Sequence, residues 1–380
     1  MQTILSKISQ HGYQQIVKPL LFRKKPDIVH ERLLRVGSTL QKITPVRYVI
    51  HAAWAYNNEP YLSQEICGIR YKNPVGLSAG FDKNFELVPM VKSVGFGFME
   101  GGSITLHNCA GNPKPWFHRL PKTKSLVVHA GLANHGVVAV IDRLSSYPSS
   151  TFVNFPINIS VAKTNSKEAA SEDEAINDYI GSLKHIAQSD IGDMITINIS
   201  CPNTFGGEPF TTPKRLDKLL ARIDTLQLSR SLYIKMPSQM PWEDYDALLK
   251  VAARHSVTGV TVSNLVKDRS TANISDPLPD SVKGNLSGKP AYEASNLLIK
   301  KTYQAYGERF VIIGVGGIFS AEDAYAKIKL GASLVELITG MIFEGPQLVG
   351  QINQGIVRLL KQDGYSNVSQ AIGVDARRAG

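Results

Sequence analysis

A cysteine flanked by asparagines follows one of the most apolar runs of the chain. The run Met194–Ile197 leads directly into the stretch Asn198–Thr204, which reads NISCPNT. Asparagine offers both a donor and an acceptor, so several asparagines suit the amide or imide edges of a flat heterocycle. The stretch therefore predicts a polar site immediately after a buried strand, with Cys201 in its centre.

The same arrangement, an apolar run that ends in small or polar residues, recurs along the chain. A lysine at such an end can balance an anion or a reduced, negatively charged cofactor ring, and glycine turns let backbone N–H groups close on a phosphate. The sequence therefore predicts a cofactor that carries phosphate. The residues at these ends are Ala79, Gly80, Lys83, Ser103, Asn158, Asn198, Cys201, Lys235, Ser263, Asn264, Gly316, Gly317, Thr339 and Gly340.

Eight short apolar runs, separated by segments with a helical pattern, carry these residues. Eight such repeats indicate a parallel (β/α)8 TIM barrel, in which functional residues lie at the carboxyl ends of the strands. An open doubly wound sheet is the competing architecture, but it lacks an early GxGxxG here. The section 103–150 is longer than an ordinary loop and suggests a functional excursion. The predicted strand runs are 73–80, 95–102, 155–161, 194–200, 231–236, 259–264, 310–317 and 333–340.

The first 45 residues form a separate, helical part of the chain. Residues 1–25 and 26–40 both show amphipathic helical spacing, and Pro26 opens the second segment. This helical pair packs on the main domain or rests its apolar face on a membrane, with basic residues at the headgroups. We therefore divide the chain into residues 1–45, a membrane-associated segment, and 46–380, the barrel.

Composition narrows the possibilities further. The chain has 380 residues, 43% of them hydrophobic, which is ample for a large core. Its net charge of +10 suits an anionic partner such as lipid headgroups, nucleic acid or phosphate. Three cysteines without a zinc-type spacing indicate a reducing compartment and no metal site. No apolar run reaches the roughly 20 residues that a membrane span requires.

Five motifs are jointly specific: NPVGLSAGFDKN, INISCPNT, NLSGKP, IIGVGGI and GYSNVSQAIG. Together they resemble those of the dihydroorotate dehydrogenase family, flavoproteins of pyrimidine synthesis that use FMN. The resemblance extends from about Tyr13 to the tail. Its N-terminal helices, including PDIVHERL, look like those of the quinone-using class 2 branch, which associates with the membrane surface and frames a quinone tunnel.

The resemblance implies a role for each matching residue. Cys201 falls at the position of the catalytic base, which takes a proton from C5 of dihydroorotate while a hydride leaves C6 for FMN. A free cysteine has a pKa near 8.5, so a thiolate there needs local stabilisation. His30 and Arg119 fall at polar positions of the quinone tunnel. The implied FMN contacts are Ala79, Gly80, Lys83, Ser103, Asn158, Asn198, Lys235, Ser263, Gly288, Gly317, Thr339 and Gly340, and the implied substrate contacts are Lys83, Asn198, Asn203 and Asn264.

Four positions depart from the family pattern. Class 2 members have serine where this chain has Cys201, a residue typical of the soluble class 1A branch. Val128 replaces the asparagine of an Asn-x-x-Gly motif that holds the substrate, and His129 is a candidate to compensate. Leu265 stands where a hydroxyl residue is usual, and Ile338 stands where class 2 has a tyrosine.

The function expected from the resemblance is oxidation of dihydroorotate to orotate with a quinone as acceptor, at the cytoplasmic side of the cell membrane. The alternatives are an FMN oxidoreductase for another cyclic amide, a soluble electron acceptor, a dihydrouridine-synthase-like enzyme acting on RNA, and a flavin-binding protein without catalysis. The RNA alternative lacks an RNA-binding appendage, so no nucleic-acid partner is expected.

Overall fold

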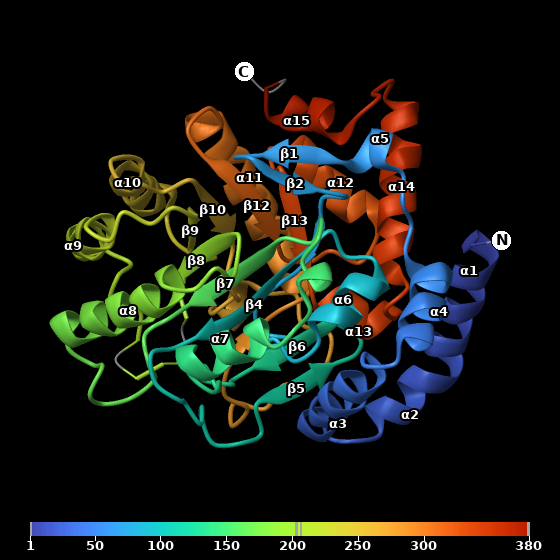
Figure 1. Cartoon of the computed structure of the whole chain (residues 1–380), viewed down its shortest axis with the longest axis horizontal. Helices are drawn as coiled ribbons and strands as arrows, with labels where there is room; N and C mark the ends of the chain where they lie inside the picture. Colours follow the sequence, from blue (N-terminus) through green and yellow to red (C-terminus); the bar gives the residue numbers. More distant parts are fainter. Residues whose placement is uncertain (1, 202–203, 206, 378–380) are drawn as a thin grey trace.

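The computed structural model describes residues 2–201, 204–205 and 207–377. Eight parallel strands close into a barrel in the order β10–β12–β13–β3–β4–β7–β8–β9, and β9 pairs with β10 (Figure 1). Seven strands fall within predicted runs and β4 overlaps the run 95–102 but continues to Ile104, so the barrel prediction is confirmed. The strands are β3 (Val75–Leu77), β4 (Phe98–Ile104), β7 (Ile157–Val161), β8 (Met194–Asn198), β9 (Ser231–Lys235), β10 (Gly259–Val262), β12 (Val311–Val315) and β13 (Leu334–Leu337).

The interior of the barrel has an apolar layer and a polar layer. Side chains of a strand alternate between its two faces, so residues two apart face the same side. At the amino ends of the strands the interior is closed by the buried cluster Tyr71, Phe98, Met194, Tyr233, Ile313 and Leu334. One step toward the carboxyl ends, the inward-facing residues are Glu100, Asn158, Thr196, Lys235, Thr261 and Glu336.

Helices surround the barrel and supply most of the outer core. Side-chain caps begin two of them, because the Ser171 and Ser320 hydroxyls accept from the N–H groups of Glu174 and Asp323. The helices are α6 (Val88–Val94), α7 (Val137–Ser145), α8 (Glu172–Ala187), α9 (Pro213–Asp224), α10 (Trp242–Ala253), α11 (Tyr292–Tyr306), α12 (Ala321–Lys329), α13 (Thr339–Glu344), α14 (Leu348–Gln362) and α15 (Val374–Arg377).

Two small sheets lie outside the barrel. The hairpin of β1 (Gln64–Ile66) and β2 (Ile69–Tyr71) places Tyr71 in the apolar cluster at the amino ends of the strands. The long section after β4 forms β5 (Phe117–Leu120) and β6 (Ser125–Val128), and β11 (Asn285–Leu286) joins them from a distant part of the chain. This second sheet places residues over the carboxyl ends of the barrel strands.

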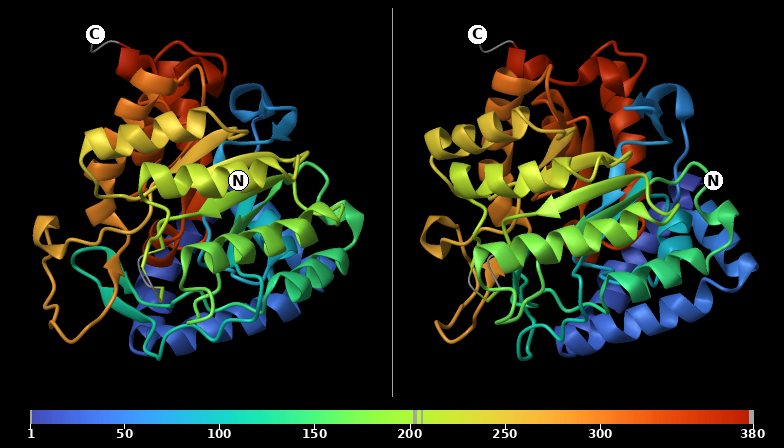
Figure 2. Two further views of the ribbon diagram at one scale, coloured as in Figure 1. Left: turned by 90° about the vertical axis from the view of Figure 1, so that its left-hand side faces the viewer. Right: turned by 60° about the vertical axis from the view of Figure 1, so that its left-hand side comes forward.

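The N-terminal helices lie along one side of the barrel (Figures 1 and 2). The segment from α1 (Gln2–Gly12) through the π-helical turn Tyr13–Val17 to α2 (Lys18–Phe22) is followed by α3 (Pro26–Leu40), as the predicted pair requires. A further helix, α4 (Thr44–Trp54), and the short α5 (Glu59–Leu62) follow. The expected domain boundary at residue 45 therefore falls in the first turn of α4.

Candidate active site

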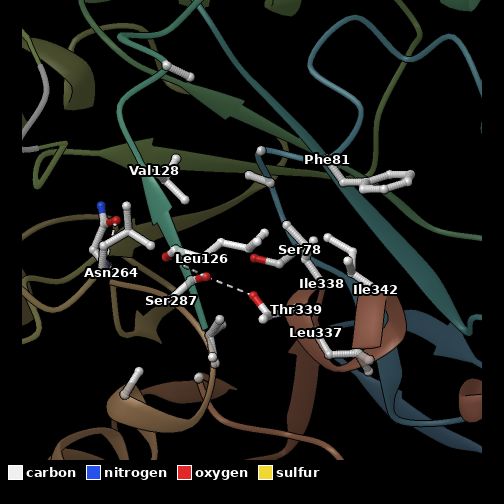
Figure 3. Close-up of a pocket in the computed structure, with 18 of the residues that line it drawn as sticks. Ser78, Phe81, Leu126, Val128, Asn264, Ser287, Leu337, Ile338, Thr339 and Ile342 are labelled. Carbon is white, nitrogen blue, oxygen red and sulfur yellow. Dashed lines mark hydrogen bonds between the residues drawn. The ribbon is translucent and has the colours of Figure 1, made fainter. Parts of the chain in front are cut away.

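A cavity of about 250 Å³ opens at the carboxyl ends of the barrel strands. Residues from the ends of β3, β4, β8, β9, β10, β12 and β13 form its floor and sides, while β5, β6 and α3 cover it. Figure 3 shows Leu126 and Val128 of β6 on one side of this cavity, with Ser78 and Thr339 on the other. The sheet and the helix therefore convert an open barrel mouth into an enclosed chamber.

Cys201 lies at the edge of this chamber, three residues after β8 ends. It is partly buried and packs against the apolar cluster of Cys109, Leu132 and Ala162. Lys163 lies in the same region, and its Nζ donates to the Phe205 carbonyl at 2.7 Å. Burial lowers the pKa of Lys163, while negative charge on Asp178 and Cys201 opposes that shift. Lys163 and Cys201 therefore line the same small pocket and are close enough to interact electrostatically.

Asparagines at the ends of two strands form one hydrogen-bonded group beside the cysteine. Asn264 Nδ2 donates to the Ser200 carbonyl at 2.8 Å and to Asn198 Oδ1 at 3.2 Å. Asn198 Nδ2 in turn donates to Ser103 Oγ at 2.9 Å. The side chains of β4, β8 and β10 are thus locked together, and a planar ligand meets amide groups with fixed orientation.

Lys83 reaches the cavity from the loop that follows β3. Buried Asp82 shapes this loop, since its carboxylate accepts from the N–H groups of Glu86 and Leu87 at 2.8 and 2.7 Å. Lys83 Nζ lies 5.6 Å from the ring centroids of both Trp116 and Phe117. Burial lowers the pKa of Lys83 to about 8, against the opposing effect of Asp82 and Asp27. Lys83 therefore remains largely cationic at pH 7.

Two glycines shape the wall where a flat, phosphate-bearing cofactor is expected, one by leaving space and the other by close packing. Gly80 has φ +113°, and a Cβ there would meet only Ile338 Cδ1, at 3.8 Å, so it would project into the cavity. Gly317 has φ +75° and contacts Tyr292 too closely to carry a side chain. Together with the hydroxyl and amide groups of Ser103, Ser263 and Asn198, these turns fit FMN.

The cavity extends from the barrel mouth to the N-terminal helices. His30 of α3 donates from Nε2 to the Phe81 carbonyl at 2.7 Å, and burial and nearby Lys83 lower its pKa to about 4. Arg119 of β5 stacks 4.5 Å from the ring of Phe22 and donates to the Lys24 carbonyl at 2.7 Å. His30 is therefore neutral at pH 7, and Arg119 fastens the connection between α2 and α3 to the small sheet.

Most residues predicted for the site do meet at this cavity. Asn158 does not line it: the Asn158 side chain lies inside the barrel, where Nδ2 donates to Thr196 Oγ1 at 2.8 Å. Asn203 lies outside the described residues. The predicted residues that do line the cavity are Ala79, Gly80, Lys83, Ser103, Asn198, Cys201, Lys235, Ser263, Asn264, Gly288, Gly317, Thr339 and Gly340, with His30 and Arg119 toward α3.

The three unusual apolar residues also face this cavity. Val128, Leu265 and Ile338 all line it, so each departure from the family pattern affects a ligand-contacting wall. His129 is absent from the cavity-lining residues of the described chain, and its Nδ1 lies 3.4 Å from Asn112 Nδ2. His129 therefore lies away from the part of the cavity wall where Val128 replaces the family's asparagine.

Two features of the site escaped the sequence analysis. Lys163 lies two residues after β7, and a lysine near the end of a strand is the signal that identified Lys83 and Lys235. The prediction for this strand used only its asparagine, Asn158. Glu100 and Glu336 occupy the barrel interior with fully buried side chains. Nothing local marks that pair, because the two residues are 236 positions apart and meet only through the order of the strands.

Comparison with known proteins places this geometry in a family. Residues 61–360 match the family model described as dihydroorotate dehydrogenase. Proteins named dihydroorotate dehydrogenase (quinone) from Crocosphaera subtropica and a Sulfurovum species are 32% and 35% identical, covering 96% and 94% of this chain and 98% and 97% of theirs. A ligand-free DHODH crystal structure from Eimeria tenella superposes with a TM-score of 0.80 at 26% identity, over 92% of this chain and 99% of that one. The chain therefore belongs to the dihydroorotate dehydrogenase family.

Proposed function

We propose that this protein oxidises dihydroorotate to orotate, with FMN as its cofactor and a quinone as the electron acceptor. The observation that carries the proposal is the meeting of Cys201, Asn198, Asn264 and two lysines around one cavity. The names of the full-length relatives support the same substrate and the same acceptor. Orotate is an anion with imide edges, so it matches a site that combines ammonium and amide groups.

In this reaction the substrate loses a hydride from C6 and a proton from C5, which creates the ring double bond. FMN, when bound, supplies the hydride acceptor. The chain's own part is to take the proton on the Cys201 thiolate, with Lys163 favouring the anionic form of the thiol. Asn198 and Asn264 hold the edges of the ring, and Lys83 balances the carboxylate of the substrate.

We propose that FMN is held by residues of three kinds. Lys235 and Asn198 suit the polar edge of the ring, and Ser103 and Ser263 supply hydroxyl groups beside it. Gly80 leaves space on the cavity wall for the ring. The proposed phosphate-side residues are Gly288, Gly317, Thr339 and Gly340.

The N-terminal helices are proposed to lie on the membrane surface and admit the quinone. Of the 15 exposed large hydrophobic side chains in the described chain, 11 lie between Leu5 and Val49. None of the helices in the described part is long and apolar enough to cross a membrane. An apolar surface flanked by lysines and arginines suits the interface of a bilayer with anionic lipids. We place the protein at the cytoplasmic side of the cell membrane.

A second candidate function is oxidation of a less polar cyclic amide by the same chemistry. Val128 and Leu265 favour it, because they remove polar groups from the cavity wall. Both candidate functions use the same cofactor and the same catalytic base. They differ only in the ring that the cavity accepts.

Steady-state turnover separates these possibilities. Purified protein supplied with FMN, dihydroorotate and a soluble quinone should form orotate and reduced quinone in equal amounts. Dihydrouracil, which lacks the carboxylate, serves as the matched control substrate and should react far more slowly. Turnover of dihydrouracil but not dihydroorotate would favour the second candidate, and turnover of neither by FMN-loaded protein would contradict the proposal.

A further inference from the structure

Two glutamates lie side by side beneath the floor of the cavity. Glu100 is the third residue of β4, Glu336 is the third residue of β13, and both are 0% exposed. The short strand β3 separates these two strands, and Glu336 is in register with Gly76, which has no side chain to stand between them. Glu336 also lines the cavity, whereas Glu100 lies entirely within the barrel.

Among the described residues, Lys235 is the one cation that interacts with this pair. Lys235 Nζ, on β9, lies 3.9 Å from Glu100 Oε1 and donates to the Ser78 hydroxyl at 3.5 Å. Lys235 also lines the cavity, so its charge acts on both sides of the floor. If both carboxyls were ionised, one ammonium would face two carboxylates, and the barrel interior would carry a net negative charge.

The carboxyl oxygens provide an independent sign that a proton is present. All four are buried, and no donor from the described residues satisfies them in hydrogen-bonding geometry. Two ionised carboxylates in that position would be desolvated and would also repel each other, which is costly in a low-dielectric interior. Burial, and then the neighbouring Glu100 carboxylate, raise the pKa of Glu336 well above its usual range, while Lys235 and Ser78 act in the opposite direction.

We propose that Glu100 and Glu336 share one proton at neutral pH, so that the carboxyl pair and Lys235 together form a charge-neutral floor under the cofactor site. The proton lies on Glu336, whose hydroxyl donates to the Glu100 carboxylate, and Glu100 in turn pairs with Lys235. This assignment concerns the protein alone and holds whatever ring the cavity binds.

The proposal gives Glu100 and Glu336 a positioning role, exerted through Lys235. Without a counter-ion, the Lys235 ammonium would stabilise negative charge on a group bound in the cofactor site. A neutral floor makes the electrostatic potential in that site less positive. Resting on the proposed function, the inference is that the Glu100 carboxylate, by compensating Lys235, lowers the reduction potential of the flavin compared with a floor that carries an uncompensated lysine. Loss of the shared proton would leave a second carboxylate charged and would lower the potential further.

The charged and titratable neighbours of Glu336 can be named element by element. β4 contributes Glu100, β9 contributes Lys235, and β2 contributes Tyr71, whose phenol is kept neutral because burial raises its pKa. Within the described chain, Ser78, directly after β3, and Val315 of β12 also lie against Glu336, and neither of these side chains titrates. The pH response of the pair therefore depends on one carboxylate and one ammonium.

The pH dependence of unfolding tests the shared proton. A carboxyl whose pKa is raised by folding retains its proton in the native state and releases it on unfolding, so the unfolding constant rises up to tenfold per pH unit above about pH 4.5. Denaturant unfolding of the protein as purified, from about pH 5 to about pH 8, should show this slope. Glu336→Gln should reduce the slope of the logarithm of the unfolding constant against pH by up to one, because it removes the group that holds the proton.

A matched control isolates the pair from other titrations. Glu308→Gln makes the same chemical change at an exposed position and should leave the slope of the wild type unchanged. Asp82 and Lys327, whose pKa values are shifted to about 6 and about 7, titrate in the same range but are common to all variants. Parallel slopes for wild type and Glu336→Gln would overturn the proposal.

Two further measurements keep the test decisive if Glu336→Gln folds poorly. The infrared spectrum of the wild type at neutral pH should contain the carbonyl band of a buried protonated carboxyl, and Glu100→Gln should remove it because the remaining glutamate ionises beside Lys235. The double variant Glu100→Gln/Glu336→Gln should raise the flavin reduction potential above that of wild type. A wild-type spectrum without the band would contradict the shared proton, whereas an unchanged potential would contradict only its effect on the flavin.

Discussion

Replacing Val128 with asparagine restores an amide to the wall of the cavity where this chain has an apolar side chain. Val128 ends β6, where it pairs with Phe117 of β5 and Asn285 of β11, so its backbone position is held from both sides. Its side chain faces the cavity beside Leu126 (Figure 3). It also packs at the edge of a cluster that includes Leu126 and Phe343. Asparagine is close to valine in size, so the exchange changes polarity much more than volume.

The expected magnitude follows from one additional hydrogen bond. A net hydrogen bond contributes about 1 kcal/mol, which corresponds to roughly fivefold tighter binding of orotate. In the ligand-free protein the same amide lies in a largely apolar wall, and an unsatisfied polar group costs about 1–3 kcal/mol. Val128→Asn should therefore bind orotate more tightly and unfold more easily without ligand, with much of that loss recovered when orotate is added.

Calorimetric titration with orotate and thermal unfolding with and without orotate measure both effects. Val128→Leu is the matched control, since it changes the side chain at the same position without adding a polar group, and it should show no gain in affinity. If Val128→Asn bound orotate no better than Val128→Leu, the reasoning from the missing amide would be refuted. If only Val128→Asn bound orotate at all, the natural substrate would be a different ring.

Three further predictions concern other parts of the cavity. Cys201→Ala should retain FMN but slow flavin reduction by dihydroorotate by roughly 10²–10⁴-fold, while Cys201→Ser keeps part of the rate; a near-normal rate in the alanine variant, measured by stopped flow, would exclude the thiol as base. Because Lys83 has a pKa of about 8 and is cationic below it, orotate affinity should fall up to tenfold per pH unit above that value, and Lys83→Met should abolish this pH dependence. Deleting residues 1–43 should reduce liposome binding and quinone turnover while the remaining protein still binds FMN; unchanged quinone turnover would place the acceptor elsewhere.

The barrel could be predicted from the sequence because buried parallel strands have an unmistakable pattern. Each strand is a short, buried and mostly apolar run, and small or polar residues lie at or just after its end, so strand and strand end are visible together. The small sheet was not predictable in the same way. β11 has only two residues, Asn285 and Leu286, and its partner β6 lies more than 150 positions earlier, so its pairing depends on the folded barrel.

The N-terminal helices α1 to α3 were predictable from the local sequence pattern, whereas α4 was not predicted. The two N-terminal amphipathic patterns predicted α1 to α3, including the start of α3 at Pro26. α4 was not predicted, although Pro45 follows Thr44 at the first turn of a helix, a position that favours proline. The boundary between the N-terminal segment and the barrel remains a proposal.

Site residues were predictable where the end of a strand determined their position, as for Cys201, Asn264 and Lys235. Asn158 shows the limit of this reasoning, because it is only the second residue of β7, so its side chain lies within the barrel rather than at its mouth. The Glu100–Glu336 pair required the strand order and the exact register across β3. Neither the strand order nor the register can be derived from the sequence around two residues that are so far apart in the chain.

Anaerobic mixing of the purified, FMN-loaded protein with dihydroorotate is the most direct test of the central claim. The account predicts that the visible absorbance of the flavin is lost in one turnover, that one orotate forms for each flavin reduced, and that added quinone restores the absorbance. A flavin that is reduced by dithionite but remains oxidised in millimolar dihydroorotate would contradict the claim that this cavity oxidises dihydroorotate.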